Sequence, residues 1–387
     1  MDTVETMMRQ LIPAGRKIDL SKTGGWQKSL EDFFEIADYV FTTSGTAALI
    51  YALSVLKKKR PAQTEVILPA YTCPDVLSAV IYSELTPVLV DLKTDSTQLD
   101  LDALNSSINK NTLAIIAIDL FGLPENYTEL SKLAKTNNIF IVRDSAQSFS
   151  NDIVQSIKDV DAIVFTFGRG KPVTLLGCGM VLFNKSIQHR NNNQLNQLQS
   201  SSVVKFFIRS VIYNMLVNKN IYWWVEKFPF LNIGKTEYHE YAGEIVSYSA
   251  LIKFLPQNIA SFLGATTDVQ KFLINAIDDL PSSKIKLPFS HGTVTEYDRL
   301  NRLPVLISDL NIRERIYKEL NSNGLGASKM YPTALPDIAN VPKLFSNQNY
   351  PQASKFSMHV LTLPVHEMVL MEDAMKMIEI IKRLLAS

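Results

Sequence analysis

The chain has 387 residues, with 39 lysines and arginines against 38 aspartates and glutamates and a formal net charge of +1. Apolar residues make up 46% and charged residues 20%, which excludes a wholly disordered or coiled-coil chain. The balanced charge gives no general attraction to nucleic acid. This length fits two domains, or one large domain with an appendage.

The cysteine content and the first residues bear on the compartment. Two cysteines, Cys73 and Cys178, do not make a disulfide framework in a chain of this length, so we expect a reducing, cytoplasmic setting. With only five histidines besides, we expect no metal site. Residues 1–10 carry two acids and no long apolar core, so we expect no secretory signal. No apolar stretch reaches the length of about 18 residues that a membrane-spanning helix needs.

Short apolar runs alternate with helical patterns along the first half of the chain. Uniformly apolar strands separated by helices predict an α/β fold with a mostly parallel sheet, covered on both faces. Ligands of such sheets bind beyond the carboxyl ends of the strands, so the polar residues there matter most. Strands are expected at 65–68, 87–90, 113–118, 139–142, 162–167 and 180–183, and helices at 75–84 and 129–137.

The pattern changes after about residue 186. Residues 191–202 form a polar stretch that precedes a segment rich in aromatic side chains. From about residue 291 a smaller α/β unit follows, with strands expected at 303–307 and 360–363 and helices at 312–322 and 371–385. We therefore expect a large domain over residues 1–250, with an aromatic insert at about 190–240, and a smaller C-terminal domain over residues 251–387.

Several segments near strand ends carry residues suited to chemistry. Ser44-Gly45-Thr46 opens a helix expected to run through Leu56, and free amides at a first helical turn suit a phosphate. Taken alone, the same residues are explained by helix capping. The Asp119–Pro124 segment after strand 113–118 is typical of a plain turn.

An aspartate and a lysine follow the next two strands. Asp144 needs a cation or an N–H partner at a buried strand end, or else serves as a helix N-cap. Lys171 lies between a glycine and a proline, which is unusually rigid for a solvated lysine, although a surface turn is the simpler interpretation. A phosphate-binding P-loop is excluded because Phe165 stands where its first glycine should be. A phosphate-type turn, a strand-end acid and a lysine, in this order, fit pyridoxal phosphate.

The chain resembles the DegT/DnrJ/EryC1/StrS family of sugar aminotransferases, over roughly residues 25–185 and 295–387. The aspartate block and the lysine–glycine block, in this order, are the specific part of the match. The matching segments are FTTSGTAAL (41–49), EVILPAYTCPDVLSAV (65–80), PVLVDL (87–92), IDLFGLPEN (118–126), IVRDSAQS (141–148), FTFGRGKPVTLLGCGMV (165–181) and YPQASKFSMHVLTLPVHEMV (350–369).

The resemblance implies a pyridoxal-phosphate-dependent transferase of fold type I, with a large domain carrying a mostly parallel sheet and a smaller C-terminal α/β domain. Such an enzyme moves an amino group from an amino acid, with glutamate expected, to a keto sugar linked to a nucleotide. The setting would be cell-surface polysaccharide or amino-sugar biosynthesis. A homodimer is also implied, because the family's active sites lie at the subunit interface.

The resemblance also assigns roles residue by residue. Lys171 would bind the cofactor as a Schiff base and later move a proton, and Asp144 would pair with the pyridinium nitrogen. Gln147 would contact the side of the cofactor that bears its 3′-hydroxyl. The phosphate would be bound by Gly45, Thr46 and Thr166, the last in place of the family's usual serine.

The sequence departs from the family at two places. Where the family stacks an aromatic ring on the cofactor stands Cys73, so the ring would be covered by this cysteine or by nearby Tyr71. The family's Gly-x-Asn-x-Arg segment is replaced by residues 238–251, which leaves the cross-subunit contact and the carboxylate site of the amino donor unassigned. Arg169 is either an anion contact or a solvated charge. Two residues of the smaller domain, Tyr331 and His366, lie in family-like segments near the expected substrate mouth, and we expect them to be structural rather than catalytic.

The aromatic segment, residues 203–233, has two interpretations. Its uncharged run of nine residues between Arg209 and Lys219 is too short to span a bilayer. A helical excursion packed on the body or at a dimer interface is the simpler interpretation. The alternative is an amphipathic patch that rests on the inner face of the membrane.

Two other functions remain open from the sequence. Dehydratase relatives replace the Schiff-base lysine, so the presence of Lys171 favours an aminotransferase. A non-catalytic or regulatory relative that keeps the fold is the first alternative, motivated by Cys73 and the missing Gly-x-Asn-x-Arg segment. The second is a fold-type-I enzyme that acts on amino acids only.

Overall fold

The computed structural model describes residues 9–21, 24–34, 38–187, 202–226, 236–245, 250–290, 299–345 and 348–387. Its main feature is a seven-stranded sheet of order β1-β7-β6-β5-β4-β2-β3. The neighbours from β6 to β3 pair in parallel, whereas β7 runs antiparallel to both β6 and β1. The strands are β1 (Asp38–Thr42), β2 (Glu65–Pro69), β3 (Thr86–Val90), β4 (Thr112–Ile118), β5 (Phe140–Asp144), β6 (Ala162–Thr166) and β7 (Gly179–Phe183).

Two apolar cores cover the two faces of this sheet, because alternate residues of a strand point to opposite sides. On β4, Ile116 packs in one core and Ile115 in the other. One core is completed by α3 (Gly45–Lys59), α4 (Pro74–Tyr82) and α13 (Pro351–His359). The other is completed by α2 (Trp26–Phe34), α5 (Leu101–Ser107), α6 (Tyr127–Asn137), α7 (Asn151–Gln155) and α10 (Leu255–Leu263).

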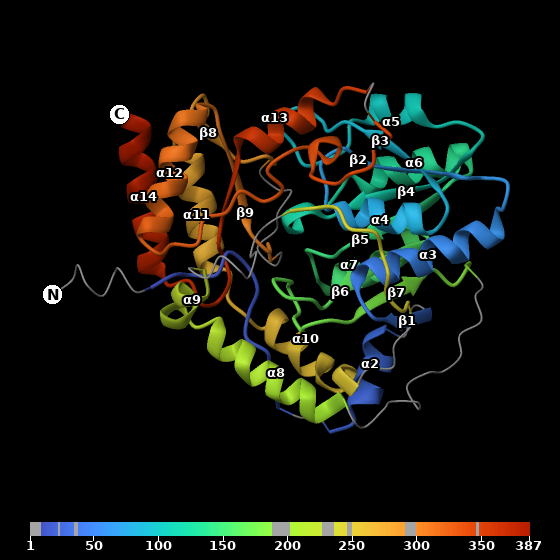
Figure 1. Cartoon of the computed structure of the whole chain (residues 1–387), viewed down its shortest axis with the longest axis horizontal. Helices are drawn as coiled ribbons and strands as arrows, with labels where there is room; N and C mark the ends of the chain where they lie inside the picture. The colour runs from blue at the N-terminus through green and yellow to red at the C-terminus, as the bar shows by residue number, and fades with distance from the viewer. Residues whose placement is uncertain are drawn as a thin grey trace.

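A smaller antiparallel sheet of order β10-β9-β8 lies to the left of the large sheet in Figure 1, with a layer of helices on its far side. Its strands are β8 (Ile285–Lys286), β9 (Leu303–Ile307) and β10 (Val360–Leu363). The helices are α11 (Asp268–Asp278), α12 (Leu310–Ser322) and α14 (Met371–Ala386), which enclose a third apolar core with this sheet. Asp309 caps α12 by accepting from the amides of Asn311 and Ile312.

The division into a large and a small domain follows these cores. Residues of α10 share a core with the large sheet, and residues of α11, α12 and α14 share a core with the small sheet. The sequence analysis placed the boundary near residue 250. We propose a boundary nearer residue 265, because α10 packs with the large domain.

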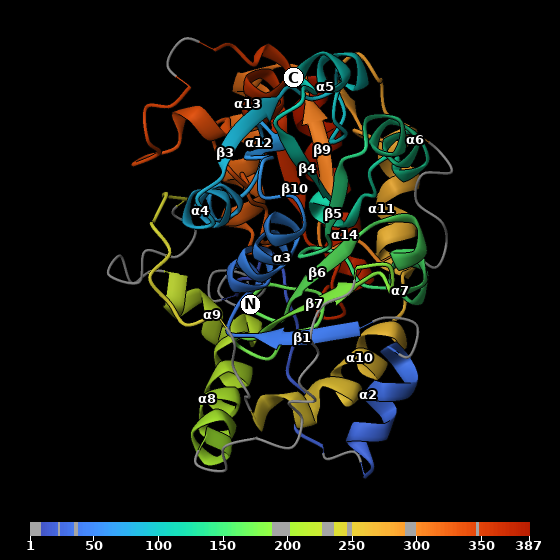
Figure 2. The same ribbon diagram turned by 90° about the vertical axis from the view of Figure 1, so that its right-hand side faces the viewer.

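Most of the expected elements are confirmed, including strands 303–307 and 360–363 and both C-terminal helices. The sequence analysis did not identify β1, which is a short edge strand with a half-exposed start. The polar stretch 191–202 and the end of the aromatic segment, 227–233, lie almost wholly outside the described residues. The described start of that segment forms α8 (Ser202–Leu216), which lies at the lower edge of the molecule in Figures 1 and 2, and then α9 (Lys219–Glu226).

Two features are absent from the described residues. Within that part of the chain, none of the helices combines the length and apolar character needed to cross a bilayer. The same residues contain no group of three or more histidine, cysteine, aspartate or glutamate side chains placed to hold a metal ion.

Strand β7 passes so close to the turn after β1 that only glycine fits at its first position. A Cβ added at Gly179 would overlap with the backbone carbonyl of Ser44 and would lie 2.7 Å from Oγ1 of Thr42. Thr42 is the last residue of β1 and Ser44 follows it closely, so the overlap is relieved only by moving that strand away from β7.

We predict that Gly179→Ala destabilises the protein by about 2–3 kcal/mol, because a methyl group must displace backbone rather than a flexible side chain. Chemical denaturation measures the loss. Gly24→Ala is the matched control, since a Cβ at Gly24 meets nothing within 4 Å. Equal stability of the two variants would contradict the close approach of β7 to Ser44.

Candidate active site

The candidate residues come together at one edge of the large sheet. Strands β4, β5 and β6 run parallel, and β1 points the same way because β7 is antiparallel to both its neighbours. The carboxyl ends of these strands therefore meet, as expected for a ligand site in an open α/β sheet. Asp144 is the last residue of β5, and the segments that follow the other three strands contain Gly45, Asp119 and Lys171.

The residues predicted to bind phosphate come together from two segments far apart in the sequence. Gly45 begins α3 and lies against the end of β6, so that a Cβ added there would be 2.7 Å from Cβ of Thr166 and 3.1 Å from its Oγ1. Ser44 caps the helix by accepting from the Ala47 amide. Within the described residues, the amides of Gly45 and Thr46 have no hydrogen-bond partner. These free N–H groups beside the Thr166 hydroxyl suit an anion.

A buried network fixes the turn that carries Asp144 and Gln147. The carboxylate of Asp119, which is fully buried, accepts from Nε of Arg143 at 2.8 Å. It also accepts from the hydroxyl groups of Tyr127, Ser145 and Ser148, at 2.9, 2.7 and 2.9 Å respectively. The segment interpreted from sequence as a plain turn therefore holds the next strand end in place.

Asp144 lies at the end of β5 with its side chain buried. Its Oδ1 accepts from the Ala146 amide at 2.9 Å. Burial raises the pKa of Asp144 to about 6, while the Ala146 amide and the charge of Lys171 act in the opposite direction. A desolvated carboxylate of this kind is stabilised by a nearby cation, which a protonated pyridine nitrogen would supply.

Gln147 and Cys73 meet at a tyrosine of the smaller domain. Oε1 of Gln147 accepts from the Phe121 amide at 3.0 Å, and its Nε2 lies 3.4 Å from the hydroxyl of Tyr331. The same hydroxyl hydrogen-bonds with the thiol of Cys73. Burial raises the pKa of this thiol to about 12, so Cys73 stays neutral. Tyr71, in contrast, is buried against Tyr331, and its hydroxyl donates to the Met330 carbonyl. That Cys73 rather than Tyr71 covers the cofactor ring stays a proposal.

The loop that carries Lys171 is held from three sides. Gly15, in the N-terminal segment, packs so closely that a Cβ there would lie 2.9 Å from Cα of Gly170. The side-chain amide of Asn301, in the smaller domain, donates from Nδ2 to the Gly170 carbonyl at 3.2 Å. The hydroxyl of Tyr213, on α8, bonds the Gly170 amide and the side chain of Thr174. Thr174 in turn donates to the Lys171 carbonyl at 2.9 Å.

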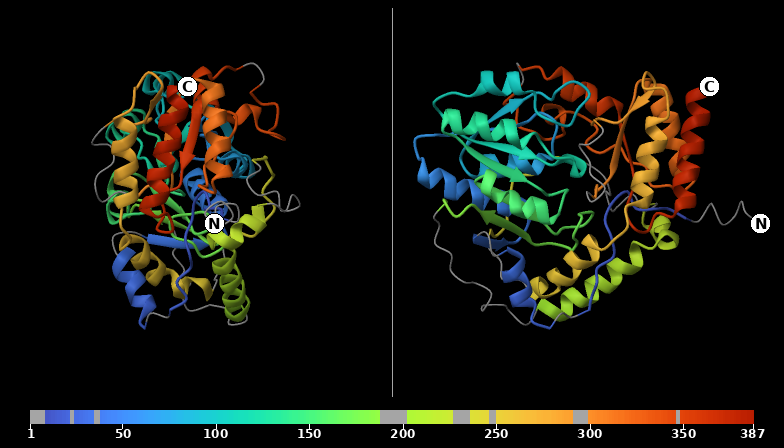
Figure 3. Two further views of the ribbon diagram at one scale, coloured as in Figure 1. Left: turned by 90° about the vertical axis from the view of Figure 1, so that its left-hand side faces the viewer. Right: turned by 180° about the vertical axis from the view of Figure 1, so that it is seen from behind.

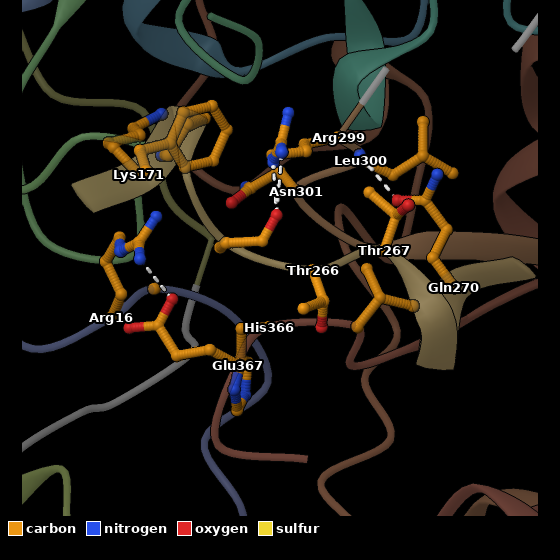
Figure 4. Close-up of a pocket in the computed structure, with 15 residues that line it drawn as sticks. Arg16, Lys171, Thr266, Thr267, Gln270, Arg299, Leu300, Asn301, His366 and Glu367 are labelled. Carbon is orange, nitrogen blue, oxygen red and sulfur yellow. Dashed lines mark hydrogen bonds and ion pairs between the residues drawn. The ribbon is translucent and has the colours of Figure 1, made fainter. Parts of the chain in front are cut away.

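A pocket opens beside Lys171, between the two domains. Figure 4 shows that its walls come from the N-terminal segment, the residues after α10, the segment before β9 and the segment after β10. Arg16 is paired with Glu367 across the pocket, and its Nη2 also donates to the Ser261 carbonyl at 3.1 Å. The imidazole of His366 donates from Nε2 to the Ile12 carbonyl at 2.8 Å, and burial lowers its pKa to about 4. The neutral His366 thus ties the N-terminal segment to the smaller domain.

A second arginine, Arg302, lies next to Tyr331. Its Nη1 donates to the hydroxyl of Ser328 at 3.0 Å, whereas its Nε is buried without a hydrogen-bond partner. Burial lowers the pKa of Arg302, and the groups that act to raise it are tyrosines, among them Tyr331 and Tyr71. Among the described residues, no carboxylate lies within ion-pair distance of this guanidinium. A buried cation without an acid partner is costly and is typical of an anion site.

Similarity to known proteins identifies the family of the chain. Residues 4–215, which are more than half of the chain, match the family model of the DegT/DnrJ/EryC1/StrS aminotransferase family. The chain belongs to this family.

Curated relatives match over part of the chain. GDP-perosamine synthase of Escherichia coli O157:H7 is 28% identical over 173 residues, which are 43% of this chain and 46% of that protein. The L-glutamine:2-deoxy-scyllo-inosose aminotransferase of Streptomyces kanamyceticus is 34% identical over 117 residues, which are 30% of this chain and 27% of that protein. The chain thus spans about half the length of these relatives or less.

Solved structures match over nearly the whole chain. PseC of Helicobacter pylori, an aminotransferase of pseudaminic acid biosynthesis, superposes with a TM-score of 0.66 at 17% identity, covering 96% of this chain and 93% of PseC. A Bacillus subtilis protein solved with its bound cofactor PMP gives a TM-score of 0.67 at 17% identity, covering 96% of this chain and 79% of that protein. At these identities the likeness shows the fold, which is that of the fold-type-I transferases.

The departures from the family's usual pattern are visible in the structure. The described part of segment 238–251 lies beside the predicted phosphate-binding residues of its own chain: the Thr43 amide donates to the Ile245 carbonyl at 3.1 Å, and the Thr43 hydroxyl lies 3.2 Å from that of Tyr241. Residues 246–249 lie outside the described residues. Arg169 is exposed. Whether it contacts an anion or is simply a solvated charge stays a prediction.

Sequence reasoning missed the residues that support the site rather than form it. Asp119 was treated as a turn residue, and Gly15, Tyr213, Asn301 and Arg302 were not singled out. Asp119 and Arg143 are both charged residues at the ends of apolar strands, and this pattern was a usable signal. The other residues lie in segments that approach the site only in the folded chain.

We predict that Asp144→Asn makes the cofactor-free protein more stable at neutral pH. The folded chain binds the Asp144 proton with a pKa of about 6 against 3.8 for an ordinary aspartate, so ionisation costs stability as the pH rises between these values. The shift corresponds to about 3 kcal/mol at pH values above about 7, and to about 1.5 kcal/mol near pH 5.

Urea denaturation of both proteins at about pH 5 and about pH 8 measures the effect. The asparagine keeps the acceptor for the Ala146 amide, so the variant removes only the charge. The advantage of the variant should grow by about 1.5 kcal/mol between the two pH values. A constant difference would contradict the raised pKa of Asp144.

Proposed function

We propose that the protein is a pyridoxal-phosphate-dependent aminotransferase that moves an amino group from an amino acid to a nucleotide-linked keto sugar. The observation that carries this proposal is the convergence of Lys171, Asp144 and the Gly45–Thr166 contact at one sheet edge. Family membership agrees with it. The names of relatives, such as GDP-perosamine synthase, support a sugar as the acceptor.

The residues present fit the cofactor. Its phosphate would lie at the free amides of Gly45 and Thr46 beside the hydroxyl of Thr166, where a larger residue at position 45 would fill the cradle. Asp144 would hold the proton on the pyridine nitrogen, which relieves the cost of burying its own charge. Gln147 is held by the Phe121 amide and would contact the side of the ring that bears the 3′-hydroxyl.

When bound, pyridoxal phosphate supplies an electron-accepting ring that stabilises the electron pair left when a proton leaves the donor's α-carbon. The Nζ of Lys171 would attach the cofactor and then carry that proton. The Asp144 carboxylate would stay ionised because it faces the protonated pyridine nitrogen, and by holding that proton in place it would keep the ring electron-poor. The contacts of Gly15, Asn301 and Tyr213 around Gly170 hold the backbone of this loop, which limits the positions that the lysine amine can take.

Arg302 is our candidate for the carboxylate site of the amino donor. Its guanidinium lies beside Tyr331, which contacts both Gln147 and Cys73. Cys73 in turn is close enough to Lys171 for the lysine charge to oppose the rise that burial causes in the pKa of its thiol. A donor carboxylate would supply the missing counter-ion of this buried cation. Glutamate is the donor that we propose, as the resemblance implies.

The remaining properties of the assembly are also proposals. We expect a cytoplasmic homodimer that takes part in polysaccharide or amino-sugar biosynthesis, and no nucleic-acid partner. The peripheral membrane contact suggested for residues 203–233 concerns the surface of α8 and not the cofactor site.

Visible absorbance of the purified protein, supplied with pyridoxal phosphate, tests the enzyme proposal. We predict a band from the lysine-bound cofactor that glutamate bleaches, and no such band in Lys171→Ala. Lys171→Arg is the matched control, because it keeps the positive charge but has no amine that can attach the cofactor. Addition of a nucleotide-linked 4-keto sugar to the bleached enzyme should restore the band.

Other results would favour the alternatives. A wild-type protein that binds no chromophore would contradict the proposal and favour a non-catalytic relative. Bleaching by amino acids that no nucleotide-linked keto sugar reverses would favour an enzyme acting on amino acids only.

We predict that Arg302→Gln weakens the use of glutamate by about 30-fold or more, since a buried charge-assisted contact is lost. The half-reaction with glutamate should slow, whereas return of the amino group from the loaded enzyme to the keto sugar should keep its rate. Stopped-flow absorbance separates the two. The exposed Arg315→Gln on α12 is the control, and equal slowing of both half-reactions by Arg302→Gln would contradict a donor-specific role.

A further inference from the structure

Helix α8 presents an apolar face to solvent. The side chains of Val204, Phe207, Ile208, Ile212 and Met215 are 69%, 47%, 54%, 50% and 57% exposed. On the following helix α9, Trp224 is 55% exposed and packs edge-on against Trp223. Figures 1 and 3 show α8 along the outer edge of the molecule, so that one long side faces away from the body. Contiguous exposed apolar surface of this kind marks a site of interaction.

The exposed side chains have the spacing of a single helical face. Together with Val211, they follow positions i, i+3, i+4, i+7, i+8 and i+11, which fall within an arc of about 140° at about 100° per residue. Lys205 and Arg209 are exposed and come next around the helix, along one border of this arc. The α8 sequence contains no aspartate or glutamate. The exposed Lys253 adds a third cation on the segment that packs beside α8 through Phe254.

The opposite face of α8 explains why the helix is held in place without these residues. Phe206 is buried against Phe254. The side chain of Asn214 accepts from the Ile18 amide at 2.7 Å and donates to the Ile18 carbonyl at 2.8 Å. Tyr213 bonds the loop before Lys171. The inner face thus contains the polar anchors and the outer face is almost wholly apolar, which is the reverse of an ordinary surface helix.

We propose that the outer face of α8, with Trp224, docks on an anionic lipid surface. The helix would lie flat in the interface, with the apolar arc among the acyl chains and the cations of its border at the lipid phosphates. The exposed Trp224, on the helix that follows α8, has the amphipathic ring that suits the polar–apolar boundary of a bilayer. The helix is about 22 Å long, so it can lie on a membrane but not cross one.

The charge pattern favours lipid over a second copy of the chain. A two-fold contact between two α8 helices would bring the border cations of one copy close to those of the other, and α8 carries no acid to neutralise them. An anionic membrane neutralises all of them at once. The docking would keep the Lys171 loop, which Tyr213 holds from the inner face, close to the membrane surface.

Co-sedimentation of the full-length, cofactor-loaded protein with vesicles tests this proposal. We expect binding to phosphatidylglycerol–phosphatidylcholine vesicles and little binding to pure phosphatidylcholine. Met215→Glu should lower binding at least about tenfold by placing a charge in the middle of the apolar arc. Met375→Glu, on the exposed side of α14, is the matched control, because Met375 is 49% exposed and the substitution is the same. The visible band of the cofactor confirms that each variant is folded.

A charge reversal separates the two parts of the surface. Lys205→Glu with Arg209→Glu should abolish the preference for phosphatidylglycerol and leave the cofactor band unchanged. Wild-type protein that stays in the supernatant with phosphatidylglycerol vesicles would overturn the proposal. So would a Met215→Glu variant that binds like wild type. A fall in oligomeric state by light scattering in Met215→Glu, with vesicle binding absent from wild type, would assign the face to a second copy instead.

Discussion

The carboxylate of Asp119 is the contact on which the candidate site depends most. It is fully buried at the end of β4, and it accepts from Arg143 and from three hydroxyl groups. Buried ion pairs contribute little net stability, because desolvation offsets the attraction between the charges. Their value lies in geometry: the hydroxyl groups of Ser145 and Ser148 can reach this carboxylate only if the turn after β5 takes one shape. That turn carries Asp144 and Gln147, so the position of both depends on Asp119.

Two charged side chains of the site, Asp144 and Arg302, are buried without an ion-pair partner among the residues that the structure describes. Burial raises the pKa of Asp144 and lowers that of Arg302, so each prefers its neutral form more than an exposed residue of its type would. A pyridinium cation would relieve the first, and a donor carboxylate would relieve the second. Burying these two charges without partners lowers the stability of the folded protein. The same free energy becomes available for binding ligands of opposite charge. Stability and ligand binding therefore respond in opposite directions when either charge is removed.

Helix α8 links this site to the outside of the molecule. Tyr213 and Asn214, on its inner face, hold the Lys171 loop and the N-terminal segment through directed hydrogen bonds. Because a few polar contacts position the helix, its outer face is free to carry apolar residues that the fold does not need. Each of the two interpretations of the aromatic segment then applies to a different face of α8. The inner face packs on the body, and the outer face is our proposed lipid contact.

The sequence by itself determined the local chemistry: apolar strands, capped helices, and the order of the phosphate-type turn, Asp144 and Lys171. These features depend on residues close together in the chain, where periodicity and strand ends can be recognised directly. Tertiary structure decided what lies across from them. The contact of Gly45 with Thr166, of Tyr331 with Cys73, and of Asn301 with the Lys171 loop each join residues more than a hundred positions apart. No fixed separation in the sequence predicts such contacts, because chain topology and close packing determine which segments meet.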